Sequence, residues 1–343
     1  MKLISSMENN QKFDLRKDHN IRCEMEYKEL PTINDLMDTL RNTLTTAWHI
    51  NSIHEPGINK WLNNFTGEAL NNKEIFDKNA KEFEQRIALF LLCNFVYYNE
   101  EEVKHLMKTM LRNYIHNYFI NLSVTEIDDD DIIKLINDTS FLPLGNPSES
   151  SSYMLYLFRQ INDLSKNDFK EKKDAKNIVF VDDFSISGSQ AERYLKKYFN
   201  NHLHTENRKK FILLMISTEE AIKRIKSLYE DIEVYSCIVL NEKSKVFSDE
   251  SIVFKNYSPK IKECAKWICE YYGNLILSEE EKNQGGTPLG FRGGGYMMGT
   301  YYNTPNNTLP VFWSEKNKWH PIFTRYNKKY TSDKGLIVEG EYV

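Results

Sequence analysis

Apolar side chains recur every three or four positions through residues 31–119, which is the spacing of one face of a helix. Two such stretches contain Ile33, Leu36, Met37, Leu40, Ile87, Phe90, Leu91 and Phe95. Residues 1–30 are instead polar and charged, with no sustained period. We therefore predict a polar N-terminal arm over residues 1–30 and a helical region over residues 31–135.

A run of four aspartates, residues 128–131, stands just before the apolar Ile132 and Ile133. Acidic side chains suit the positive end of a helix dipole, so we favour a helix that begins here. A cation site is the alternative. Consecutive aspartates on a helix point in different directions, however, so a single metal ion would not collect them.

From residue 141 onward, short apolar strands alternate with amphipathic helices. The expected strands are residues 141–144, 178–181, 211–216 and 232–237, and the expected helices are residues 153–161, 190–199, 219–228 and 260–272. This alternation is typical of parallel βαβ units with right-handed crossovers. We predict an α/β core with a mainly parallel sheet over residues 136–280.

The last part of the chain is rich in glycine and aromatic residues. Seven of the 14 glycines fall between residues 285 and 299, and three prolines follow. The aromatic residues here are Tyr301, Tyr302, Phe312, Trp313, Trp319, Phe323 and Tyr326. Because a flexible linker would not carry so many aromatic side chains, we predict a loop-rich cap over the sheet for residues 281–343.

The amino-acid composition excludes several classes of protein. The 343-residue chain is 41% hydrophobic and 13% aromatic, which excludes a disordered protein, and its net charge of −4 argues against a strongly basic nucleic-acid coat protein. The longest apolar stretches are too short to span a bilayer, and no secretory signal is recognised. Five scattered cysteines without a C-x-x-C pair fit reduced thiols better than disulfides or zinc. We expect a cytoplasmic protein.

Residues 178–190 carry the clearest chemistry. Four apolar residues lead to Asp182 and Asp183, and a small, hydroxyl-rich turn then enters the next helix. Ligands bind beyond the carboxyl ends of strands in open α/β sheets, and backbone N–H groups at a helix N-terminus suit a phosphate. The two carboxylates would repel that phosphate but suit a neutral diol one sugar away. The pattern indicates a ribose 5-phosphate site; the alternative is that the acids only cap the turn.

The same stretch resembles the PRPP-binding motif of type I phosphoribosyltransferases, with an apolar strand, two acids and a short hydroxyl-containing loop. The resemblance implies that Asp182 and Asp183 contact the ribose hydroxyls, with Mg²⁺ near them held through ligand oxygens. The residues implied for the 5-phosphate are Ser185, Ser187, Gly188, Ser189 and Gln190. Gln190 departs from the motif, because a hydroxyl residue is usual there.

Three further groups are candidates for the same site. A loop before the helix at residue 153 fits a pyrophosphate loop through Ser148, Ser150, Ser151 and Ser152, although a helix N-cap explains these serines equally well. Arg292, among the glycines, would fold over pyrophosphate as a lid closes; the alternative is a solvated arginine. For base recognition the candidates are Asn303, Asn306, Asn307 and Trp313, against the alternative of a turn packed by aromatic residues.

Over about residues 30–325 the chain is similar to phosphoribosyltransferase-like proteins of bacterial conflict systems. The likeness rests on residues 61–65, 90–98, 143–152 and 303–313. Members of that family occur beside reverse transcriptases in certain retrons, so the resemblance implies an antiviral effector or toxin.

The resemblance also implies what such a protein binds. The leading hypothesis is an enzyme that binds PRPP or a related nucleotide with Mg²⁺ and transfers or cleaves at the anomeric carbon of ribose 5-phosphate. A catalytically silent nucleotide sensor is one alternative. A docking protein for a retron reverse transcriptase and its RNA or DNA is another. We expect no membrane partner, and the oligomeric state stays open.

Overall fold

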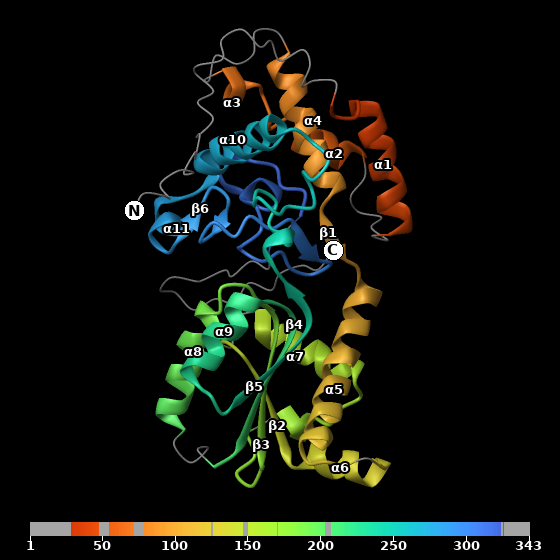
Figure 1. Cartoon of the computed structure of the whole chain (residues 1–343), viewed down its shortest axis with the longest axis vertical. Helices are drawn as coiled ribbons and strands as arrows, with labels where there is room; N and C mark the ends of the chain where they lie inside the picture. Colours follow the sequence, from red (N-terminus) through yellow and green to blue (C-terminus); the bar gives the residue numbers. More distant parts are fainter. Residues whose placement is uncertain are drawn as a thin grey trace, which may run out of the picture.

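The computed structural model describes residues 29–47, 55–71, 79–124, 126–146, 150–169, 171–202, 207–323 and 325. Most of the N-terminal arm and residues 326–343 of the predicted cap therefore lie outside the described residues. The chain forms two units, one above the other in Figure 1: a parallel sheet with its helices below, and a helical and loop-rich unit above. Within the described part of the chain, none of the helices is long and apolar enough to cross a membrane.

The sheet of the lower unit has the order β2–β3–β4–β5, and all its strands are parallel. These are β2 (Thr139–Pro143), β3 (Asn177–Ser185), β4 (Lys209–Thr218) and β5 (Ile232–Leu240), connected through α7 (Ser150–Ile161), α8 (Ser189–Asn201) and α9 (Glu219–Leu228). The predicted parallel α/β core is thus confirmed.

Helices cover both faces of this sheet. Val179 and Val181 of β3 pack toward α5 (Glu100–Asn121) and α7, whereas Ile178 and Phe180 pack toward α8 and α9. Successive residues of a strand point to opposite faces, and a parallel sheet covered on both sides is apolar on both. The N-terminal helical pattern is therefore divided in space, because α5 belongs to the sheet of the lower unit.

The helix starts follow local capping. Thr32 and Asn99 each form a capping box at the start of α1 (Ile33–Thr46) and α5. The aspartate run begins α6 (Asp129–Asn137), and the side chain of Asp128 accepts a hydrogen bond from the backbone N–H of Asp131 at 2.8 Å. The capping interpretation of this run is confirmed.

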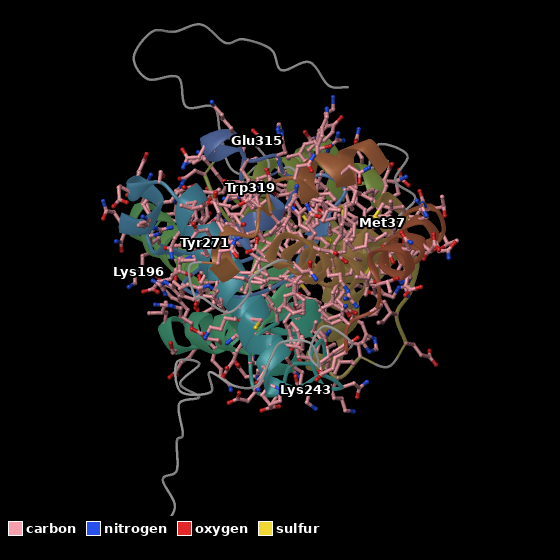
Figure 2. The ribbon with its side chains drawn as sticks, turned by 90° about the horizontal axis from the view of Figure 1, so that it is seen from above. Met37, Lys196, Lys243, Tyr271, Glu315 and Trp319 are labelled. Carbon is pink, nitrogen blue, oxygen red and sulfur yellow. The ribbon has the colours of Figure 1, made fainter. Side chains whose placement is uncertain are left out.

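The upper unit combines segments from both ends of the chain. The early helices α2 (Glu55–Leu62), α3 (Glu68–Asn71) and α4 (Ala80–Cys93) pack with α10 (Pro259–Ile276) and with the segment after it. Trp61 is fully buried; its indole N–H donates to the Val311 carbonyl at 2.8 Å, and its ring stacks on Phe312. Figure 2 shows this unit from above, with the side chains of Met37 and Trp319 labelled in it.

Short strands pair an early and a late segment of the chain within the upper unit. β1 (Val96–Tyr98) pairs in parallel with β8 (Met298–Thr300), and β6 (Gly286–Thr287) forms a hairpin with β7 (Gly290–Phe291) after α11 (Glu279–Asn283). The residues after β8 return to the upper end of the sheet. They are held there by buried aromatic side chains, and this places a polar loop over the carboxyl ends of the strands.

Candidate functional site

The acid pair lies in the last residues of β3. The strand continues to Ser185, beyond the apolar run, because Asp182 and Phe184 still pair with Leu214 and Ile216 of β4. Alternation along the strand places Asp182 on the α8–α9 face and Asp183 on the α5–α7 face. Both side chains are buried, with only 4% and 2% of their surface exposed.

Residues of the C-terminal loop hold Asp183. Its Oδ2 accepts hydrogen bonds from the Tyr302 hydroxyl at 3.2 Å and the Asn303 amide at 3.1 Å, and its Oδ1 accepts from the Phe184 N–H at 2.9 Å. Asp182 Oδ1 accepts from the Asp183 N–H at 2.9 Å. Both oxygens of Asp183 are thus hydrogen-bonded without a ligand, which fixes the loop to the strand end.

Tyr302 serves here as a neutral donor. Burial, followed by the negative charges of Asp183 and Asp182, holds the pKa of Tyr302 well above its usual value, so the hydroxyl keeps its proton. Its ring also meets Tyr153 of α7 edge to face, with 5.6 Å between the ring centroids. The strand end, α7 and the C-terminal loop therefore meet at one buried point.

The turn after the acids is held by the next βα unit. Gly188 has φ +68 and precedes the first residue of α8, and the Ser187 hydroxyl donates to Ser189 Oγ at 3.2 Å. Arg224 donates to the Ser187 carbonyl at 3.2 Å, and the Thr218 hydroxyl donates to the Ile186 carbonyl at 2.6 Å. These bonds leave the N-terminal end of α8 facing the cavity, as a phosphate cradle requires.

One cavity of about 670 Å³ joins these parts. It lies where the end of β3 and the start of α8 meet the polar loops of the upper unit. The residues expected at the site that line it are Asp182, Asp183, Ser185, Ser187, Gly188, Ser189, Gln190, Ser150, Asn303, Asn306, Asn307 and Trp313. The structure thus brings the two halves of the central motif together with most of the other candidates.

The serine loop contributes less than the sequence suggests. Of its serines, Ser150 lines the cavity, whereas Ser151 is fully buried and Ser152 bonds the Asn146 carbonyl at 3.4 Å. Ser148 lies outside the described residues. Ser150 is the first residue of α7, so a helix start does face the cavity here.

Arg292 is not among the residues that line the cavity. It is exposed, with a left-handed φ of 52, and its guanidinium carbon lies 5.5 Å from the ring centroid of Phe291, which does line the cavity. The role of Arg292 over pyrophosphate therefore stays a prediction that requires this loop to move.

The residues expected to recognise a base also hold the loops together. The Asn303 amide binds Asp183, the Asn307 amide donates to the Phe291 carbonyl at 3.1 Å, and the Trp313 indole N–H donates to the Thr308 carbonyl at 2.9 Å. These contacts agree with the alternative of a turn packed by aromatic residues. They leave the base-recognition role of Asn306 and its neighbours as a prediction.

Tyr302 and Arg325 are contributors to this region that were not singled out from the sequence. Arg325 lines the cavity with its guanidinium carbon 4.6 Å from the ring centroid of Trp313, and Tyr302 binds Asp183 beside the cavity. No local motif marks either residue, because each acts on a partner far away in the chain or across a loop.

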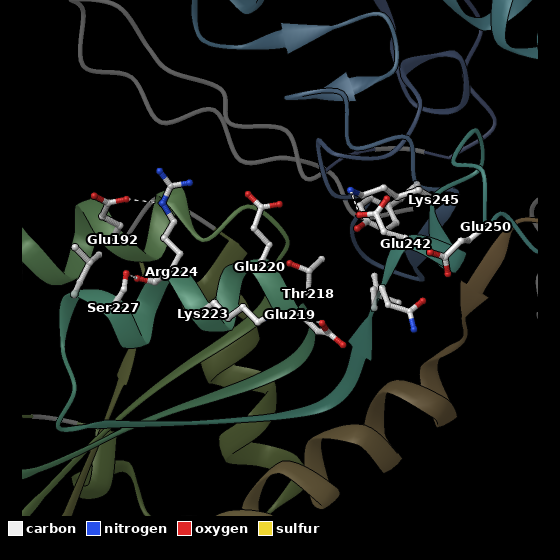
Figure 3. Close-up of a pocket in the computed structure, with 14 residues that line it drawn as sticks. Glu192, Thr218, Glu219, Glu220, Lys223, Arg224, Ser227, Glu242, Lys245 and Glu250 are labelled. Carbon is white, nitrogen blue, oxygen red and sulfur yellow. Dashed lines mark hydrogen bonds and ion pairs between the residues drawn. The ribbon is translucent and has the colours of Figure 1, made fainter. Parts of the chain in front are cut away.

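A second cavity of about 920 Å³ lies between α9 and the segment after β5 (Figure 3). Its walls carry mixed charges, with ion pairs between Arg224 and Glu192 and between Lys245 and Glu242. It is larger but contains neither the acid pair nor the turn before α8. Thr218 and Arg224 on its wall support that turn from behind.

The protein side chains of the cavity could hold Mg²⁺ only together with oxygen atoms of a bound ligand. In the part of the chain that the structure describes, no three His, Cys, Asp or Glu side chains are grouped so as to hold a metal ion. Asp182 and Asp183 nevertheless offer carboxylate oxygens in the cavity. Mg²⁺ is commonly held by one or two carboxylates together with substrate phosphates, which is the arrangement available here.

Comparison with known proteins points to one family. The family model PRTase-CE matches residues 58–325, which is most of the chain. The match includes the sheet, the acid pair, the turn before α8 and the cavity loops up to Arg325. Among curated proteins, none matches the chain.

Proposed function

Because the chain belongs to the phosphoribosyltransferase-like PRTase-CE family, we propose that it binds PRPP or a related nucleotide in the 670 Å³ cavity. The observation that supports this proposal is the meeting of two carboxylates and a helix N-terminus at the end of the central strand β3. The phosphate and the sugar hydroxyls of one ribose 5-phosphate need these two environments side by side.

The reaction we propose is transfer or cleavage at the anomeric carbon. The bond between that carbon and the diphosphate oxygen breaks, the diphosphate leaves with the electron pair, and an acceptor or water forms the new bond as its proton is lost. Positioning contributes most to such a dissociative step. Asp182 and Asp183 are the carboxylates of the cavity that would help to hold Mg²⁺, which would supply positive charge to stabilise the leaving group.

The residues would divide this work. The turn from Ser187 to Gln190 would hold the 5-phosphate through backbone N–H groups and hydroxyls. Asp182 and Asp183 would face the ring hydroxyls, and Asp183, which accepts three hydrogen bonds, would also fix the loop that covers the sugar. Burial by the C-terminal loop would limit the access of bulk water to the anomeric carbon.

The biological setting is part of the proposal. On the strength of the family resemblance, the protein would act as an effector or toxin in a retron antiphage system, with a reverse transcriptase and its RNA or DNA as partners. A sensor that binds nucleotide without turnover is the second candidate, favoured by the hydrogen bonds that already engage Asp183. Release of free pyrophosphate, followed by ³¹P NMR, separates an enzyme from a sensor.

Calorimetric titration with PRPP and Mg²⁺ tests the binding site. We expect saturable binding by the wild type and at least about 10-fold weaker binding by Asp182→Asn, because a charged hydrogen bond to the ligand is lost. Asp130→Asn, an exposed acid in the first turn of α6, is the matched control and should bind like the wild type. No binding by the wild type would overturn the PRPP assignment.

A further inference from the structure

Positive charge is scarce in the cavity. Among its described lining residues, Arg193 and Arg325 are the cations, and Asp182, Asp183 and Glu281 are the acids. Arg193 is exposed on α8. A ligand with a 5-phosphate and a diphosphate brings several negative charges, so the cavity needs a cation to bind it.

Arg325 is held in place by an aromatic platform. Its guanidinium carbon lies 4.6 Å from the centroid of the Trp313 ring, and Trp313 is itself anchored by the bond from its indole N–H to the Thr308 carbonyl. Trp313 is buried, with 9% of its surface exposed. A guanidinium held over a fixed ring loses little freedom when its N–H groups bind an oxyanion.

The hydrogen-bonding capacity of Arg325 is not used up by the protein. Its Nε is buried and has no hydrogen-bond partner among the described residues. The carboxylate of Glu281 also lines the cavity, but its Oε2 already receives Lys316 Nζ at 2.9 Å and the N–H and hydroxyl of Ser278, each at 2.9 Å. A buried donor without an acceptor is unfavourable, and a bound oxyanion would remove that cost.

Resting on the proposed function, we propose that Arg325 is a second anion-binding residue of the cavity and binds the diphosphate group of the ligand. The turn before α8 binds the 5-phosphate, and Arg325 on its Trp313 platform binds the diphosphate. The substrate class is therefore a ribose 5-phosphate that carries a diphosphate, or a nucleotide that presents the same group. Arg325 thereby takes the pyrophosphate-binding role expected of Arg292, which does not line the cavity.

Calorimetry with three ligands tests this assignment in the full chain. PRPP carries both groups, ribose 5-phosphate carries only the first, and ADP carries a diphosphate on a nucleoside. We expect Arg325→Gln to weaken PRPP binding at least about 10-fold and to change ribose 5-phosphate binding less than about 2-fold. A matching loss for ADP would extend the diphosphate subsite to nucleotides. Retained ribose 5-phosphate binding also shows that the variant is folded.

Arg159→Gln is the matched control, because Arg159 is also partly buried and lies 5.5 Å from a ring, that of Tyr156, but outside the cavity. It should bind every ligand like the wild type. Wild-type PRPP affinity in Arg325→Gln would overturn the role of Arg325 and leave the proposed function intact. Failure of the wild type to bind either sugar phosphate would overturn the proposed function, and this inference with it.

Discussion

At the scale of single residues, Asp182 and Asp183 stand next to each other but have different surroundings. The pleat of β3 turns them to opposite faces, and Asp183 accepts hydrogen bonds from Tyr302 and Asn303 of the C-terminal loop. The acid pair could be found from the sequence because its residues are adjacent. The division between the two acids could not, since the partners of Asp183 follow 119 and 120 positions later.

The hydrogen bond from Tyr302 to Asp183 should contribute to the free energy of unfolding. Tyr302→Phe keeps the ring but removes a donor from a buried carboxylate, so we expect the free energy of unfolding to fall by about 1–3 kcal/mol. Urea denaturation followed by tryptophan fluorescence measures the change. Tyr156→Phe, which alters an exposed tyrosine bonded to Gln160, should stay within about 0.5 kcal/mol of the wild type. Equal stability of Tyr302→Phe and the wild type would show that the Asp183 contact is weak.

At the scale of elements, the sequence located the strands well but placed the end of the central one too early. The apolar run of β3 stops at Val181, whereas backbone pairing continues to Ser185 opposite Ser217 of β4. Apolar residues mark where a strand is buried in the core; they do not mark where its hydrogen bonds stop. The sheet therefore carries both acids on a regular strand, which holds them more firmly than a loop would.

The turn into α8 depends on a glycine. Gly188 has φ +68, and a Cβ there would lie 3.2 Å from Cα and from the carbonyl oxygen of Ala221. We expect Gly188→Ala to lower the free energy of unfolding by about 1–2 kcal/mol and to weaken ribose 5-phosphate binding, because the turn must shift. Gly57→Ala is the control: Gly57 lies in α2 with no heavy atom within 4 Å of the added Cβ, so stability should stay equal or rise slightly. The prediction fails if the two variants behave alike.

At the scale of the whole molecule, the cavity lies between two units that are interleaved in sequence. The parallel sheet could be predicted from strand–helix alternation. The packing of the C-terminal loops on the early helices could not, because contacts such as Trp61 to Val311 join residues 250 positions apart. Local periodicity carries no information on such pairs. This is also why the cap was expected over the sheet alone.

Cysteine thiols with raised pKa values occur in both units. Burial raises the pKa of Cys237 in β5 from 9.0 to about 11, that of Cys93 in α4 to about 12, and that of Cys269 in α10 further still. At pH 8 thiols with pKa values raised in this way stay protonated, so native thiols should react slowly with a disulfide reagent such as DTNB. Cys23→Ser removes the cysteine outside the described residues.

The raised thiol pKa values predict how the free energy of unfolding changes with pH. An unfolded thiol ionises near its usual pKa of 9.0, whereas the folded Cys237 and Cys93 thiols ionise only near pH 11 and 12. Their contribution to stability is therefore present below pH 9 and is lost as the pH rises toward 11–12.

In Cys23→Ser at pH 8, DTNB should label the thiols rapidly only when urea unfolds the protein. Rapid labelling of the native protein would contradict the raised pKa values of these thiols.

The distance in sequence between Trp61 and Val311 also bears on how the protein is made. During synthesis the indole of Trp61 leaves the ribosome 250 residues before the carbonyl that it binds. At ordinary rates of translation this interval is roughly 10–50 s. Until then the early helices lack their aromatic partners, and the sheet has its acid pair but no loop to cover it. A protein built in this order cannot complete this cavity before its chain is nearly complete.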